Sequence, residues 1–197
     1  MAVPPGTILT VFALVFVAEL PDKTMIATLI MGSRYRPVLV WLGASLAFLI
    51  HAVLAVALGQ LLQLLPHRWI EAVTALLFAG GAAYLLFVPE KEEETEGEEE
   101  ADRAGVGLKT VGTAFVVIFI GEFGDLTQIL TANLAAKYNA PLAVFTGAFG
   151  ALTTVAALGA FGGRALLRYL PLAVIRKVGG ALLAGFAVYT LVTLVRG

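Results

Sequence analysis

The chain has 197 residues, of which 59% are hydrophobic and only 14% are charged, and its mean hydropathy is +0.92. Soluble domains are about half apolar and about a quarter charged, so this composition excludes an ordinary soluble domain and predicts an integral membrane protein. The formal net charge of −1 and the lack of a basic cluster give no indication of nucleic-acid binding. The chain has no Cys, which excludes disulfides, thiolate metal sites and a cysteine nucleophile.

Apolar stretches long enough to span hydrocarbon, which takes about 20 helical residues, recur along the whole chain. In chain order these six stretches cover residues 7–31, 38–62, 69–88, 108–133, 141–163 and 171–195. They predict an all-α integral membrane fold with six transmembrane helices. No Lys or Arg precedes the first stretch, so the cationic region of a cleaved signal peptide is missing and we expect that stretch to remain in the mature protein.

One connection, residues 89–107, is long and strongly acidic. Nine of the 14 acidic residues lie between Glu90 and Asp102, which predicts a solvated linker between a first unit of residues 1–88 and a second unit of residues 108–197. Nine Lys and Arg residues fall on the linker side of the predicted membrane, and only Arg68, Lys137 and Arg196 fall on the other. The positive-inside rule therefore predicts a cytoplasmic linker and outward-facing termini, in a cell membrane such as a prokaryotic inner membrane.

The two units are related by an internal repeat. Four polar residues of the first unit recur 103 positions later: Glu19, Asp22, Thr24 and Thr28 correspond to Glu122, Asp125, Thr127 and Thr131. After one inserted residue, Pro37 and Gly43 correspond to Pro141 and Gly147. Such a regular offset indicates a duplication. Since each unit has an odd number of predicted helices, the second copy enters the membrane from the opposite side, which predicts the inverted repeat of secondary transporters.

The strongest functional signal is an acidic motif that occurs once in each unit. The motifs read Glu19-Leu20-Pro21-Asp22-Lys23-Thr24 and Glu122-Phe123-Gly124-Asp125-Leu126-Thr127-Gln128. The i, i+3 spacing predicts that both carboxylates of a motif project from one helix face. An ionised side chain at the bilayer centre costs at least roughly 2.5–3.5 kcal/mol, so we expect the carboxylates to face the interior and to meet between the repeats, where they bind a cation or protons.

The residue types around these carboxylates indicate which cation the site takes. With Thr24, Thr127 and Gln128 they form an all-oxygen ligand set, which suits a hard divalent cation such as Ca²⁺ or Mn²⁺. Mg²⁺ also accepts oxygen ligands, so the residue types do not decide among the three ions. Pro21 cannot donate to the carbonyl of Val17, which predicts that this carbonyl is free for an ion, and Gly124 weakens the matching turn.

Protons and a metal ion would compete for the same oxygens, which is the minimal chemistry of a cation:proton antiporter. Lys23 can pair with Glu19 but cannot neutralise four acids, so a purely structural salt-bridge role is disfavoured. His51, within the second stretch, has two interpretations: it relays protons together with the carboxylates, or it is a satisfied polar residue packed against the first helix.

The paired motif resembles the Golgi and chloroplast calcium/manganese:proton antiporter family, whose members carry Glu-x-Gly-Asp-Lys/Arg-Thr/Ser twice around an acidic loop. The resemblance covers essentially the whole chain. It implies export of Mn²⁺ or Ca²⁺ in exchange for protons, with Glu19, Asp22, Glu122 and Asp125 as the cation-binding acids. Two positions depart from the family pattern, since Pro21 replaces a Gly and Leu126 replaces a basic residue.

Three other functions fit the sequence less well. An exporter of small organic solutes should offer a cation to the substrate carboxylate, but here Lys23 is outnumbered by acids. An intramembrane aspartyl protease should carry Gly-x-Gly-Asp, but Glu122 stands at the first position of that pattern. A purely structural membrane protein would tolerate alanine at the motifs. No sequence motif indicates catalysis or a resident cofactor. The expected partners are the divalent ion, protons and the lipid bilayer. The sequence does not decide whether the chain forms a homo-oligomer.

Overall fold

The computed structural model describes residues 4–20, 22–64, 66–87, 108–169 and 172–196, and within these ranges it contains only helices as regular elements. The predicted linker at 89–107 and Pro21 lie outside the described residues, as does the side chain of Lys23. In chain order the helices are α1 (Pro5–Glu19), α2 (Lys23–Arg34), α3 (Pro37–Leu62), α4 (His67–Phe87), α6 (Leu108–Gly121), α7 (Leu126–Tyr138), α8 (Pro141–Tyr169) and α9 (Leu172–Arg196).

Several of these helices are long and apolar enough to cross a membrane. Three qualify singly, within Pro37–Leu62, Pro141–Gly162 and Lys177–Val195. Two further candidates, which bring the total to five, arise if α1 with α2 and α6 with α7 each form one bent span. The chain is therefore a helical integral membrane protein. The predicted stretch at 69–88 forms α4 but is not among these candidates, so six spans stay a prediction.

The two apolar stretches predicted as transmembrane helices over 7–31 and 108–133 are not continuous helices, because each is broken at its acidic motif. Helices α1 and α2 are bent by 73° relative to each other, and α6 and α7 by 72°. Asp22 and Asp125 are the N-cap residues of α2 and α7, with extended backbone at ψ 164° and 175°. Gly124 has φ +79°, a left-handed conformation that glycine adopts readily. The two carboxylates of a motif therefore do not share one helix face.

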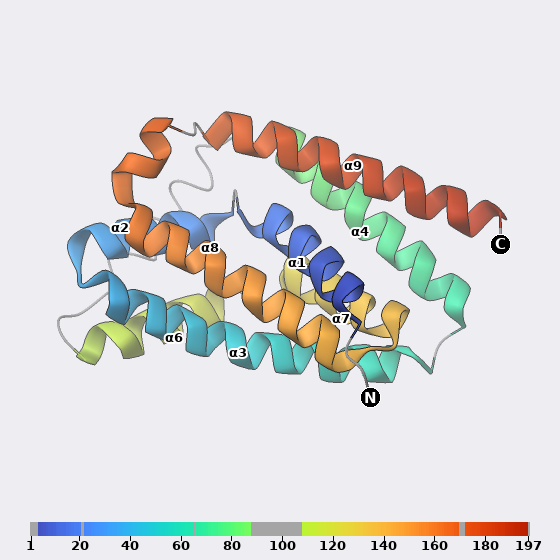
Figure 1. Cartoon of the computed structure of the whole chain (residues 1–197), viewed down its shortest axis with the longest axis horizontal. Coiled ribbons are helices and arrows are strands. Elements are labelled where there is room, and N and C mark those ends of the chain that lie inside the picture. Colours follow the sequence, from blue (N-terminus) through green and yellow to red (C-terminus); the bar gives the residue numbers. More distant parts are fainter. Residues whose placement is uncertain (1–3, 21, 65, 88–107, 170–171, 197) are drawn as a thin grey trace.

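Each broken pair packs mainly against a long helix from the other half of the chain (Figure 1). Helices α1 and α2 lie along α8, whereas α6 and α7 lie along α3, and α3 and α8 contact each other. Helices α4 and α9 pair side by side. The start of α1 and the end of α9 lie toward one end of the bundle, and the start of α6 lies toward the other (Figure 1). Neither half therefore has a complete core without the other.

The contacts across the halves follow the repeat. A Cβ atom on Gly43 of α3 would lie 2.4 Å from the Val111 carbonyl oxygen of α6, and one on Gly147 of α8 would lie 2.7 Å from the Ile8 carbonyl oxygen of α1. Gly43 and Gly147 are equivalent at the offset of 104 residues, and Ile8 and Val111 at the offset of 103. Small residues of this kind let membrane helices approach closely.

The long helix α3 shows how burial is distributed in this fold. Leu46 and Val53 are about half exposed, whereas Ala44, Ala47 and His51 are buried. A helix that is apolar all round and nevertheless exposes large aliphatic side chains matches a lipid-facing surface. Small side chains thus face the neighbouring helices, and bulky ones face the bilayer.

The close approach at Gly43 generates a prediction on stability. Gly43→Ala places its methyl group against the α6 backbone, which cannot move away as a side-chain end could. We expect a loss of about 1–3 kcal/mol, seen as a lower melting temperature of the detergent-solubilised protein. Gly112→Ala in α6 is the control, because nothing lies within 4 Å of its added Cβ. An equal melting temperature for both variants would contradict this packing.

Candidate metal site

The breaks bring the four predicted carboxylates together. Each of Glu19, Asp22, Glu122 and Asp125 offers one oxygen, and these atoms all lie within 4.8 Å of one another. Glu19 is 0% exposed and Glu122 is 4% exposed, whereas Asp22 and Asp125 are partly buried. Four carboxylates this close repel one another strongly in a medium of low dielectric constant, so the cluster requires a cation, protons or both.

The breaks also orient two helix N-termini toward the cluster. The Asp125 Oδ1 atom accepts a hydrogen bond of 2.7 Å from the Gln128 backbone N–H, the standard cap of α7. Asp22 holds the corresponding N-cap position of α2. The N-terminus of a helix carries partial positive charge, so both half-helices stabilise negative charge at the cluster. Interrupted helices that begin at a buried ion site are typical of secondary transporters.

Threonine hydroxyls complete the surroundings of the carboxylates. The Thr24 hydroxyl of α2 donates a hydrogen bond to Glu122 Oε1, which joins the first motif to the second. Thr24 is fully buried, and Thr127, its equivalent in α7, is 6% exposed. One turn further on, Thr28 and Thr131 donate to the carbonyls of Thr24 and Thr127, both at 2.8 Å. These two hydroxyls therefore donate to backbone carbonyls of their own helices.

Gln128 joins the second motif to α3. Its Nε2 lies 2.7 Å from His51 Nδ1, and its Oε1 accepts a 2.7 Å hydrogen bond from the Gly124 backbone N–H. His51 Nε2 in turn lies 3.1 Å from the carbonyl oxygen of Phe119 in α6. His51 therefore contacts α6 and α7 of the second half, and both of its ring nitrogens have hydrogen-bond partners there.

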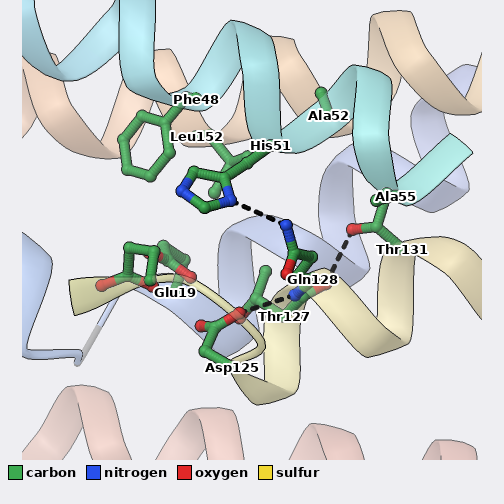
Figure 2. A pocket seen from close by; sticks show the side chains of 11 residues that line it. Glu19, Phe48, His51, Ala52, Ala55, Asp125, Thr127, Gln128, Thr131 and Leu152 are labelled. Atoms are coloured by element: carbon green, nitrogen blue, oxygen red, sulfur yellow. Dashed lines mark hydrogen bonds between the residues drawn. The ribbon is translucent and has the colours of Figure 1, made fainter. Parts of the chain in front are cut away.

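A small cavity of about 20 Å³ adjoins the carboxylates (Figure 2). This volume matches one water molecule or one ion stripped of most of its water. One wall carries the polar groups of the acidic cluster and of α7, and the other is formed by His51 together with small and apolar residues of α3 and α8. The lining consists of Glu19, Phe48, His51, Ala52, Ala55, Glu122, Asp125, Thr127, Gln128, Thr131 and Leu152.

The remaining predicted site residues have different positions. Val17 lies in the last turn of α1, partly buried, and Pro21 and the Lys23 side chain lie outside the described residues. Gly124 is exposed and makes the turn between α6 and α7. Sequence reasoning missed the Phe119 carbonyl and the apolar walls at Phe48 and Leu152. No spacing signal points to them, since a backbone carbonyl and core side chains look alike in any apolar helix.

Fold and site together define the class of protein. A helical membrane protein with a buried carboxylate cluster at paired helix breaks has the organisation of a secondary transporter. A family model described as "Divalent cation/proton antiporter GDT1" matches the chain twice, over residues 7–93 and 110–196. The chain therefore belongs to the GDT1 family of divalent cation/proton antiporters. This is a family of transporters and not of enzymes, so the aspartyl protease alternative is excluded.

Curated relatives support this membership across most of the chain. A GDT1-like protein of Synechocystis is 33% identical over 191 residues, which cover 89% of this chain and 91% of that protein. The chloroplastic protein PAM71 of Arabidopsis thaliana is 29% identical over 93% of this chain and 56% of its own length. GDT1-like protein 1 of rice is 27% identical, with 61% of its length covered. The chain thus spans about 56–61% of these chloroplast relatives. No solved structure matches the chain.

The hydrogen bond between the halves generates a prediction. Thr24→Val keeps the shape of the side chain but removes the donor to buried Glu122. Residues that orient metal ligands typically change metal affinity by about 10–100-fold when they are replaced, so we expect divalent-cation affinity to fall about tenfold or more, measured by isothermal titration calorimetry. Thr28→Val is the control, because its hydroxyl donates only to carbonyls of its own helix. Unchanged affinity in Thr24→Val would show that this hydrogen bond does not support the site.

Proposed function

We propose that this chain exchanges a divalent cation, Mn²⁺ or Ca²⁺, for protons at the cluster formed by Glu19, Asp22, Glu122 and Asp125. The observation that carries the proposal is the convergence of these four carboxylates within 4.8 Å, with Glu19 and Glu122 almost completely buried. Oxygen-only ligands favour hard cations. Membership of the divalent cation/proton antiporter family supports the same chemistry.

The exchange follows from competition for the same oxygens. A divalent cation binds the ionised carboxylates, with the hydroxyls of Thr24 and Thr127 and the amide oxygen of Gln128 as additional ligands. The Val17 carbonyl is a further candidate ligand from the first half. When the cation leaves, protons neutralise the carboxylates, so that the protein can change the side to which the site opens without burying unpaired charge. Coupling therefore needs no separate proton carrier.

The architecture offers a route to alternating access. In our proposal residues 1–88 and 108–197 form two inverted three-helix repeats that rock against each other around the site, in a cell membrane with the 89–107 linker in the cytoplasm and both termini outside. The reciprocal contacts of Gly43 with α6 and of Gly147 with α1 support equivalent hinge surfaces in the two repeats. Export is the direction that the family resemblance implies.

A transport assay tests this proposal. The protein is reconstituted into liposomes containing a pH-sensitive dye, and Mn²⁺, Ca²⁺ or Mg²⁺ is added separately. We expect Mn²⁺ or Ca²⁺ to drive proton movement. Glu19→Gln and Glu122→Gln should abolish it, because each removes one buried ionisable ligand of the cluster. Glu71→Gln, an acidic residue of α4 outside the cluster, should keep wild-type flux. Absence of flux with all three ions in folded wild-type protein would refute the antiporter.

Binding itself should release protons. Since a cation binds only deprotonated carboxylates, we expect Mn²⁺ added to weakly buffered protein to acidify the solution. For the same reason affinity should fall as pH is lowered, by up to tenfold per pH unit for each proton displaced. Calorimetry in buffers of different ionisation enthalpy measures the number of protons released. A binding enthalpy independent of the buffer, with affinity independent of pH, would contradict proton competition.

A further inference from the structure

Each motif supplies one half-site, Glu19 with Asp22 in the first and Glu122 with Asp125 in the second. The two half-sites have the same acids but differ in the residues that surround them. At the offset of 103 residues Gln128 corresponds to Met25, and at the offset of 104 His51 corresponds to Val155. Met25 and Val155 are fully buried apolar residues. Gln128 and His51 instead hydrogen-bond to each other at 2.7 Å. The polar link between a long helix and the motif therefore belongs to the second half-site alone, as far as the described residues extend.

The hydrogen-bond chemistry fixes the direction of this link. The Phe119 carbonyl can only accept, so His51 Nε2 carries the proton and donates it across 3.1 Å. The Gly124 N–H can only donate, so the oxygen of the Gln128 amide faces it and the amide nitrogen faces His51. Hence His51 Nδ1 is the acceptor for the Gln128 amide. Every group is satisfied by a neutral imidazole with its proton on Nε2.

The link connects the long helix α3 to the break between α6 and α7. The His51 ring is 4% exposed and packs on the rings of Phe119 and Phe123, with centroids 4.9 and 6.2 Å away. It stands on the long helix α3. At the other end Gln128 bonds Gly124 at the helix break through its side chain, and its backbone N–H caps Asp125. Figure 2 shows this chain of contacts from α3 to Asp125.

We propose that His51 is a positioning residue: through Gln128 it holds the break between Glu122 and Asp125 in the geometry that binds the divalent cation. The inference rests on the proposed function and adds a role for a residue outside the motifs. Both ring nitrogens of His51 already have hydrogen-bond partners, so in this proposal His51 neither ligates the cation nor relays its protons. Residues that orient metal ligands typically change metal affinity by about 10–100-fold when they are replaced.

The test compares two substitutions at one position. His51→Val installs the residue of the equivalent place in the other half and removes the acceptor. His51→Asn keeps an oxygen close to the place of Nδ1, so it can accept from Gln128, but it cannot titrate. In the liposome assay we expect His51→Val to raise the KM for Mn²⁺ by about 10–100-fold, with a much smaller change in kcat. His51→Asn should recover most of the wild-type KM.

Val155→Ala is the matched control, because it disturbs packing at the equivalent buried position without touching a polar link. It should leave the KM unchanged in protein that elutes as a single species. A wild-type KM in His51→Val would overturn the inference. If His51→Asn were as impaired as His51→Val, the acceptor role would be wrong and a titrating imidazole would be needed instead.

A second measurement separates this inference from the antiporter proposal. The chain has two His residues, so His67→Gln leaves His51 as a single reporter for ¹⁵N solid-state NMR. We expect a neutral imidazole protonated on Nε2, and Gln128→Leu should shift its Nδ1 resonance. A proton on Nδ1 would overturn the network even if transport occurs. The expected spectrum together with absent Mn²⁺ flux would refute the antiporter proposal but would still support the hydrogen bond between His51 and Gln128.

Discussion

The structure depends on one constraint, the cost of burying negative charge in a hydrocarbon layer. Four carboxylates share a site within 4.8 Å, and an uncompensated charge at the bilayer centre costs several kcal/mol. The fold meets this constraint with two helix N-termini and a threonine hydroxyl that reaches across the halves, and in our proposal with a bound cation. The two N-termini exist only because the helices are broken at the motifs, so the breaks are part of the site.

The same breaks explain why the two halves are inseparable. Each broken pair of helices packs on the long helix of the other half, and Gly43 and Gly147 let the backbones approach closely there. The carboxylates therefore lie where the halves meet. In our proposal, relative movement of the halves changes the surroundings of all four carboxylates and is thereby coupled directly to ion binding.

The two repeats share their acids but differ in the residues around them. Thr24 and Thr127 remain alike, whereas Met25 and Gln128 do not. The buried Met25 fills space, whereas the partly buried Gln128 needs hydrogen-bond partners for its amide. It finds them in His51 and Gly124, which together tie the second break to α3. The asymmetry is therefore a consequence of satisfying one additional polar group in a dry environment.

The sequence by itself determined the membrane class, the duplication, the two motifs and the meeting of their acids, because composition and fixed offsets are properties of the linear chain. The sequence did not predict that the helices end at Glu19 and Gly121. Two acids spaced i, i+3 have the same sequence pattern whether they lie in an intact helix or at a helix end followed by an N-cap. Only the tertiary structure decided that Gln128 meets His51, 77 residues away. Such a contact depends on how α3 and α7 pack, and helix packing leaves no mark in local spacing.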